Sequence, residues 1–196
     1  MMRARWIISL ALALWLAALG RDRFDQWIDA TVLPPLALEM SVEVLDRDGD
    51  LLRAYTVADG RWRLALPPDK VDPLYLRMLL AYEDKRFRVH SGVDWRSVLR
   101  AGLQAAWNGR VVSGGSTLTM QVARLLEEGT TGQVGGKLRQ MRVALALERR
   151  LTKDQILQLY LHLAPFGGNL EGVRAASISY FGKEPKRLTP AEAALL

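Results

Sequence analysis

Helix start signals recur along the chain from residue 73 onward, and they constrain its fold more than any other feature. Asp94 is predicted to be the N-cap of one helix, and Thr152 with Gln155 forms the capping box of another. Thr189 followed by Pro190 marks a third start, with an N-cap and a proline at the first helical position. So many start signals at helical spacing predict a mainly α-helical fold.

The apolar spacing between these signals predicts the individual helices. Residues 74–82 are apolar almost all round, which predicts a buried helix, and further helices are expected over 117–126, 135–150 and 152–163. The helix after Asp94 places Trp95, Val98, Leu99, Gly102 and Ala106 on one face. A last helix starts at Thr189, and the sequence stops at Leu196 in its second turn, so we expect a piece of a longer protein.

A small β region is predicted ahead of the helices. Residues 41–45 and 51–57 flank an Asp- and Gly-containing turn, which is typical of a β-hairpin. Trp62, Leu64 and Leu66 alternate with polar residues in the same way.

The first twenty residues contain an apolar run, residues 6–20, that only Ser9 interrupts. A membrane-spanning helix usually needs ~20 apolar residues, so this run is slightly short for an uncleaved anchor. A cleaved signal peptide is the competing interpretation, because residues 18–20 resemble a small-x-small cleavage site. Both interpretations export the rest of the chain.

The net charge of +6 is compatible with nucleic acid, anionic lipid or a phosphorylated substrate. The chain has no run of five basic residues and no basic–aromatic repeat, so nucleic acid is not expected as a partner. It contains no cysteine, which excludes disulfides and thiolate metal sites.

Adjacent carboxylates, Glu83 and Asp84, end the apolar helix. Glu83 is a candidate general base, and a solvated helix end is the alternative. Phe87 is expected to anchor the following loop by packing. His90 has no cysteine or second histidine nearby, so we expect it to orient the loop by hydrogen bonding rather than to bind a metal.

A second candidate segment begins with Gly114, Gly115, Ser116 and Thr117 and continues into the helix that carries Gln121. Such a turn offers backbone donors and hydroxyls to an anion, although ordinary helix capping explains it equally well. It is not a P-loop, because the Gly-Lys-Ser/Thr ending is missing.

Cations follow in the next helices: Arg124, Lys137, Arg139 and Arg142. A solvated face is one interpretation, and phosphate binding is the other. Lys137 shares a helical face with Gln140 and with small and apolar residues, which favours the border of a cleft or partner over bulk water.

Both segments together resemble the glycosyltransferase domain of class A penicillin-binding proteins. The pattern Glu-Asp-x-x-Phe-x-x-His-x-Gly runs from Glu83 through Gly92, and Gly-x-Ser-Thr-x-Thr-x-Gln runs from Gly114 through Gln121. Later stretches that contain Lys153, Tyr160 and residues 180–183 match too, and the resemblance covers residues 68–196.

The resemblance implies a lysozyme-like fold and an enzyme that polymerises lipid II into glycan strands, releasing undecaprenyl pyrophosphate by an inverting mechanism. The family's general base, which activates the acceptor 4-hydroxyl, corresponds to Glu83, with Asp84, Phe87 and His90 in the same motif. The donor-site residues correspond to Gly114, Ser116, Thr117 and Gln121, and the pyrophosphate-binding cations to Arg124 and Lys137.

It also implies a location and a domain order. We expect a membrane anchor over residues 1–22, a juxtamembrane connector with short strands over 23–67 and the glycosyltransferase domain over 68–196. The protein would be a single-pass protein of the bacterial inner membrane with its catalytic domain on the periplasmic side. Its expected partners are lipid II, the nascent glycan strand and other cell-wall synthesis proteins; a divalent cation, Mg²⁺ or Mn²⁺, is the expected cofactor, with no organic cofactor.

Four positions depart from the family's usual pattern: Arg124 replaces a lysine, Gly136 an arginine, Gln140 a glutamate and His162 an asparagine. The departures at Gln140 and Gly136 keep a non-catalytic lipid II-binding scaffold open as an alternative. A lysozyme-like enzyme that cleaves glycan is a second alternative, against which the membrane anchor and the paired cations argue. Because pyrophosphate is already a good leaving group, a single carboxylate, Glu83, could nevertheless suffice for polymerisation.

Overall fold

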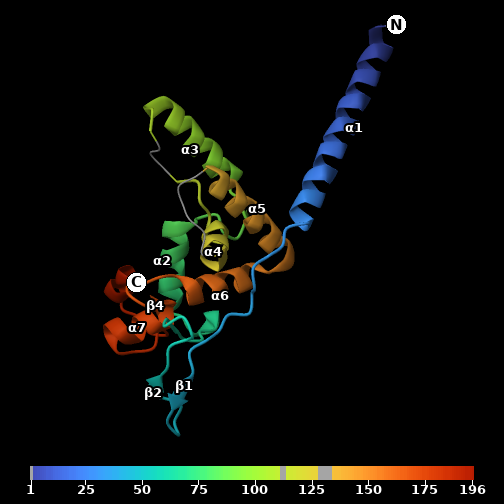
Figure 1. Ribbon diagram of the computed structural model, residues 1–196. Coiled ribbons are helices and arrows are strands. Elements are labelled where there is room, and N and C mark those ends of the chain that lie inside the picture. The colour runs from blue at the N-terminus through green and yellow to red at the C-terminus, as the bar shows by residue number, and fades with distance from the viewer. Residues whose placement is uncertain (1, 111–113, 128–133) are drawn as a thin grey trace. The chain divides into compact units, whose positions relative to one another are not determined.

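The computed structural model describes residues 2–110, 114–127 and 134–196 (Figure 1). The chain divides into two compact units, Met1–Val32 and Leu33–Leu196. The first contains the helix α1 (Met2–Asp29), which continues into the segment predicted to be the connector. In the part of the chain that is described, no helix combines the length and the apolar character needed to cross a membrane.

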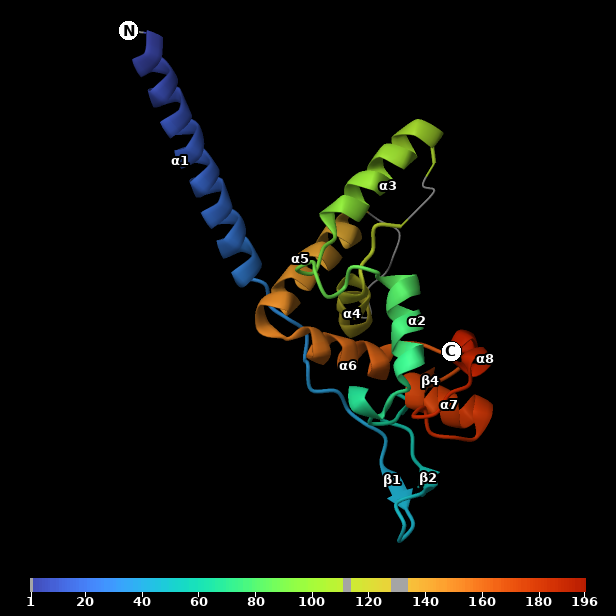
Figure 2. The same cartoon turned by 180° about the vertical axis from the view of Figure 1, so that it is seen from behind.

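The second unit begins with the predicted β-hairpin, which the structure confirms. Strands β1 (Glu43–Leu45) and β2 (Leu51–Ala54) pair antiparallel. Oδ1 of Asp46 closes the turn by accepting hydrogen bonds from the amides of Asp48 and Asp50, each at 2.9 Å. Within this unit the hairpin and α3 (Trp95–Asn108) lie at opposite ends in both ribbon views (Figures 1 and 2).

A short parallel pair joins the start of this unit to a much later segment. Strand β3 (Trp62–Arg63) pairs with β4 (Leu170–Glu171). Nε and Nη2 of Arg63 donate to Oε2 of Glu171 at 2.8 and 2.5 Å, and both side chains are buried. Buried charges are tolerated when they are paired in this way, so the pair fixes where the chain enters the helical core.

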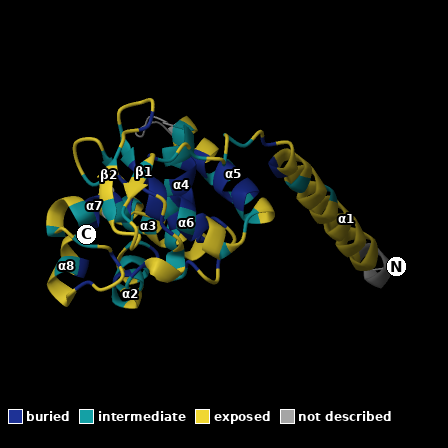
Figure 3. Cartoon of the chain, turned by 90° about the horizontal axis from the view of Figure 1, so that it is seen from below, coloured by how far each residue is buried: buried dark blue, intermediate teal, exposed yellow. Residues whose placement is uncertain are grey.

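The core forms around α4 (Leu118–Glu127), which packs against α5 (Val134–Arg150) and α6 (Lys153–Leu163). Figure 3 shows the buried residues gathered in these helices. The side chains that are almost fully inaccessible include Leu118, Val122, Leu147, Ile156 and Leu161. The predicted mainly helical fold is therefore confirmed for this unit.

The remaining elements surround this core: η1 (Pro68–Lys70), α2 (Pro73–Glu83), α7 (Val173–Phe181) and α8 (Pro190–Leu195). Asp72 caps α2 by accepting from the amide of Leu74 at 2.8 Å, and its other oxygen accepts from the amide of Leu188 at 3.0 Å. One carboxylate thus ties the start of α2 to the chain just before α8. The predicted capping box of α6 and the predicted N-cap of α8, Thr189, are both present.

Two helices expose apolar residues, and for the first of them the sequence predicted burial. The prediction that residues 74–82 are buried all round is wrong, because Tyr75 alone in α2 is buried and Tyr82 is 89% exposed. The reason is that α2 packs against the core on one face, through Tyr75, Leu76 and Leu80 among others, and borders a cavity on another. In α3 no residue is buried, and an apolar stripe is exposed along it at Trp95, Leu99, Leu103 and Trp107.

Candidate active site

The two predicted segments meet where α2 ends and α4 begins. Nε2 of Gln121 donates a hydrogen bond to Oε2 of Glu83 at 2.6 Å. Glu83 is half-buried, and among the described residues its other oxygen, Oε1, accepts no hydrogen bond. One oxygen of the carboxylate is therefore held in place while the other is left available to a ligand.

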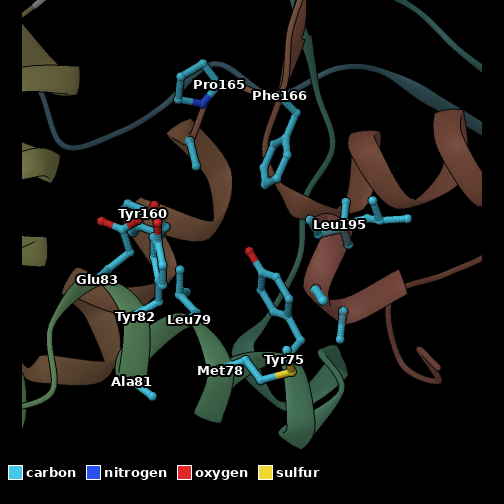
Figure 4. Close-up of a pocket in the computed structure, with 14 residues that line it drawn as sticks. Tyr75, Met78, Leu79, Ala81, Tyr82, Glu83, Tyr160, Pro165, Phe166 and Leu195 are labelled. Carbon is cyan, nitrogen blue, oxygen red and sulfur yellow. The ribbon is translucent and has the colours of Figure 1, made fainter. Parts of the chain in front are cut away.

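Glu83 lies on the wall of a cavity of about 710 Å³. The cavity is bounded by α2, the end of α6, the segment 164–166 and α8. Figure 4 shows Glu83 beside Tyr160 and the side chains of Tyr75 and Phe166 across the cavity from them. Apolar and aromatic walls with a single carboxylate are the usual composition of a ligand pocket.

The negative charge of Glu83 raises the pKa of two of the tyrosines that line this cavity. Burial, the neighbouring Tyr160 and the negative charge of Glu83 raise the pKa of Tyr75. Burial and Glu83 raise the pKa of Tyr160 to about 12, while the positive charge of Arg124 acts in the opposite direction. Both phenols therefore stay protonated at neutral pH, and Tyr160 lies within electrostatic reach of both Glu83 and Arg124.

Asp84 joins the first motif to the second in the protein interior. Its Oδ2 accepts hydrogen bonds from Nε2 of His90 at 2.8 Å and from the backbone amide of Leu118 at 2.9 Å. Nδ1 of His90 in turn accepts from the amide of Gly92 at 3.2 Å, which assigns the proton of a neutral imidazole to Nε2. Because Leu118 starts α4, the neighbour of Glu83 also caps the helix that carries Gln121.

Gly92 brings the same loop against α5. Its φ of +93° lies in the region that favours glycine, and a Cβ there would approach the carbonyl oxygen of Ala144 to 2.7 Å. Oγ1 of Thr117 donates to the carbonyl of Gly92 at 2.5 Å and accepts from the amide of Met120 at 3.1 Å. Thr117 thus links the loop to the first turn of α4.

Lys153 holds the loop from the other side. Its Nζ lies 4.6 Å from the centre of the Phe87 ring and donates to the carbonyl of His90 and to Oε1 of Glu148, each at 2.6 Å. Thr119 donates to the same oxygen of Glu148 at 2.7 Å. Sequence reasoning matched Lys153 to the family without giving it a role, because no local signal connects it with residues 87–90.

Two of the predicted cations, Arg124 on α4 and Lys137 on α5, lie within electrostatic reach of each other. Nζ of Lys137 donates to Oγ of Ser116 at 2.6 Å and to Oε1 of Gln140 at 3.2 Å. Partial burial and the positive charge of Arg124 lower the pKa of Lys137. Among the described residues no carboxylate pairs with Lys137 or Arg124, so this corner of the site attracts anions.

The described residues contain no group of three histidine, cysteine, aspartate or glutamate side chains that could hold a metal ion. Asp84, the carboxylate next to Glu83, accepts hydrogen bonds from His90 and Leu118. The divalent cation expected from the sequence stays a prediction.

The structure separates the predicted site residues into two groups. The side chains of one group are joined by the hydrogen bonds of Gln121 to Glu83 and of Lys137 to Ser116 and to the buried Gln140, with Arg124 within electrostatic reach of Lys137. The others that carry side chains are buried beneath them: Asp84, Phe87, His90 and Thr117. Gly114 is exposed in the turn before α4. Their roles toward a substrate stay predictions.

Comparison of the sequence with known proteins identifies the family to which the chain is similar. The family model described as Transglycosylase matches residues 48–196. Penicillin-binding protein 1C of Escherichia coli is 47% identical over 99% of this chain, which corresponds to 24% of that protein. Penicillin-binding protein 1A of the same organism is 33% identical over 86% of the chain and 19% of its own length.

A relative of more similar length is also found. The biosynthetic peptidoglycan transglycosylase of Pasteurella multocida is 38% identical over 67% of this chain and 53% of its own length. The chain thus spans about a quarter of the length of the penicillin-binding protein 1C that it matches.

Proposed function

The chain belongs to the transglycosylase family, and from that membership we propose that it is a peptidoglycan glycosyltransferase that polymerises lipid II into glycan strands. The observation that carries the proposal is the position of Glu83. Gln121 holds one of its oxygens at 2.6 Å, and the other accepts no hydrogen bond from the described residues. Tyr160 lies within electrostatic reach of both Glu83 and Arg124, and Arg124 within reach of Lys137, and neither cation has a carboxylate partner in the described part of the chain. A base beside an anion site is what transfer of a sugar from a diphosphate requires.

The reaction follows from these groups. Glu83 removes the proton of the acceptor 4-hydroxyl, and the oxygen attacks the anomeric carbon of the donor from the face opposite its diphosphate. The new glycosidic bond forms as the bond to the diphosphate breaks, so the configuration inverts and undecaprenyl pyrophosphate leaves. Arg124 and Lys137 stabilise the charge that develops on the leaving group. The hydrogen bond from Gln121 keeps the base in one orientation.

We further propose that the enzyme works on the periplasmic face of the bacterial inner membrane, to which α1 attaches it. Support comes from the large apolar side chains that α1 exposes, including Trp6, Ile8, Leu12 and Trp15. The exposed stripe on α3 suits contact with lipid in the same way, since tryptophans sit at its ends. Other cell-wall synthesis proteins stay predicted partners.

The decisive experiment measures glycan products from lipid II, resolved by length, for the wild type and Glu83→Gln. The substitution keeps the shape and removes the base, so we expect polymerisation to fall by ~10²-fold or more. Glu39→Gln, the same change at a carboxylate that accepts from the amide of Ala58, is the control and should leave the products unchanged.

The same assay separates the alternatives. A non-catalytic scaffold would bind lipid II and yield no glycan ladder, whether or not Glu83 is changed. A lysozyme-like enzyme would shorten preformed strands. Either result would overturn the proposed polymerase.

A further inference from the structure

Gln140 lies directly beneath the cation that would meet the substrate's phosphates. It is on α5, one turn after Lys137, and only 7% of it is exposed. Its Oε1 accepts a hydrogen bond from Nζ of Lys137 at 3.2 Å, while Oγ of Ser116 accepts a second one at 2.6 Å. The ammonium is therefore directed by two oxygens from different parts of the chain.

Both oxygens belong to uncharged groups, an amide and a hydroxyl, so the site keeps the positive charge of Lys137. A carboxylate at either position would form an ion pair with Lys137 and cancel its charge. An amide and a hydroxyl orient the ammonium and leave the charge in place. Together with Arg124, which has no carboxylate partner among the described residues, the site keeps two positive charges for an anion.

We propose that Gln140 is a positioning residue that directs Lys137 toward Ser116 without neutralising it, and thereby sets the affinity of the Lys137–Arg124 pair for a diphosphate. The identity of the ligand as a diphosphate rests on the proposed function, whereas the contacts of Lys137 are taken from the structure alone. It gives the buried amide a role through Lys137 rather than through contact with the sugar.

A glutamate at position 140 would act in two ways. It would raise the pKa of Lys137 by pairing with it, and it would compete with the diphosphate for the same ammonium. A methionine, of similar length, would instead remove this acceptor and leave Lys137 charged but held by Ser116 alone. Two substitutions at position 140 therefore separate the effect of the charge of Lys137 on diphosphate binding from the effect of its orientation.

The experiment measures the binding of inorganic pyrophosphate to the whole chain by calorimetry at pH 7, without divalent cations. We expect Gln140→Glu to weaken binding about tenfold, because an ion pair at this distance opposes the ligand. Gln140→Met should weaken it several-fold through lost orientation. Gln158→Glu adds the same charge on α6, beside a different cavity, and should bind like the wild type.

The pH profile is the readout that a merely structural role would not move. Because the pKa of Lys137 is lowered, Lys137 loses its positive charge, and the wild type loses affinity for pyrophosphate, as the pH rises through this lowered pKa. In Gln140→Glu the pKa is higher, so the corresponding loss should occur at a higher pH. Circular dichroism shows whether each variant is folded, and if Gln140→Glu is not, Gln140→Met carries the test.

Wild-type affinity in both Gln140 variants, or an equal loss in Gln158→Glu, would overturn the proposal. Failure of the proposed function would look different. In that case the wild type would not polymerise lipid II, while pyrophosphate binding would still respond to Gln140 as described.

Discussion

The backbone amide of Leu118 donates a hydrogen bond to Oδ2 of Asp84 at 2.9 Å, across 34 positions of sequence. Leu118 is the first residue of α4, and Asp84 directly follows the end of α2. The contact therefore fixes the two helix ends that carry Glu83 and Gln121. A buried carboxylate can in this way determine the geometry of the neighbouring base.

Replacing Asp84 should lower the stability of the folded protein. Asp84→Ala leaves Nε2 of His90 and the amide of Leu118 without an acceptor in the interior, so we expect the free energy of unfolding to fall by about 3 kcal/mol. Urea unfolding in mild detergent measures the change. Asp154→Ala is the control, since Asp154 pairs with Arg88 at the surface and should cost at most ~0.5 kcal/mol. Equal losses of unfolding free energy in the two variants would show that the hydrogen bonds of Asp84 stabilise the fold no more than a surface ion pair does.

Gln121 should matter to turnover and little to folding. Gln121→Leu removes the hydrogen bond to Glu83, and a hydrogen bond to a charged group is worth ~1.5–3 kcal/mol, so we expect kcat for lipid II polymerisation to fall about 10- to 100-fold. The thermal midpoint should stay near that of the wild type. Gln158→Leu, beside another cavity, is the matched control. A Gln121→Leu enzyme with full activity would show that Glu83 needs no orientation.

What the sequence predicted well depends on neighbours along the chain. The caps at Asp94, Thr152 and Thr189 act over three residues and form as expected. The β-hairpin also follows from its own turn. Local signals therefore fix where elements begin and end.

What it could not predict depends on contacts between distant segments. Lys153 reaches the carbonyl of His90 across 63 positions, and Arg63 pairs with Glu171 across 108. Nothing near any of these residues in the sequence identifies its partner. Burial of α2 was misjudged for the related reason that only packing of the whole unit decides which of its faces borders a cavity.

Gly92 should resist substitution because of space as well as conformation. Gly92→Ala places a Cβ 2.7 Å from the carbonyl of Ala144 in addition to straining a φ of +93°, so α5 or the loop must move. Gly49 has a similar φ of +88° and nothing within 4 Å of such a Cβ. We expect Gly49→Ala to cost about 1–2 kcal/mol of unfolding free energy and Gly92→Ala clearly more. Similar losses in urea unfolding would mean that the loop accommodates the extra carbon.

His162 should make folding stability depend on pH. Its Nε2 accepts a hydrogen bond from the amide of Leu66 at 2.9 Å, which requires the neutral imidazole. Burial and the charge of Arg63 lower the pKa of His162 below its usual 6.5, against the opposing effect of the Leu66 contact. As the pH falls through about 6.5, the unfolded chain takes up a proton that the folded chain does not.

The contribution of His162 to stability is therefore fully present above pH 6.5 and is lost as the pH falls toward the lowered pKa of the folded state. We expect the free energy of unfolding to fall more steeply between pH 7.5 and 5.5 in the wild type than in His162→Gln, where a side-chain carbonyl can still accept from Leu66 and nothing titrates. Urea unfolding at several pH values measures the two slopes. Parallel slopes would mean that His162 is protonated in the folded protein as readily as in the unfolded chain, and that the hydrogen bond to Leu66 does not hold the ring neutral.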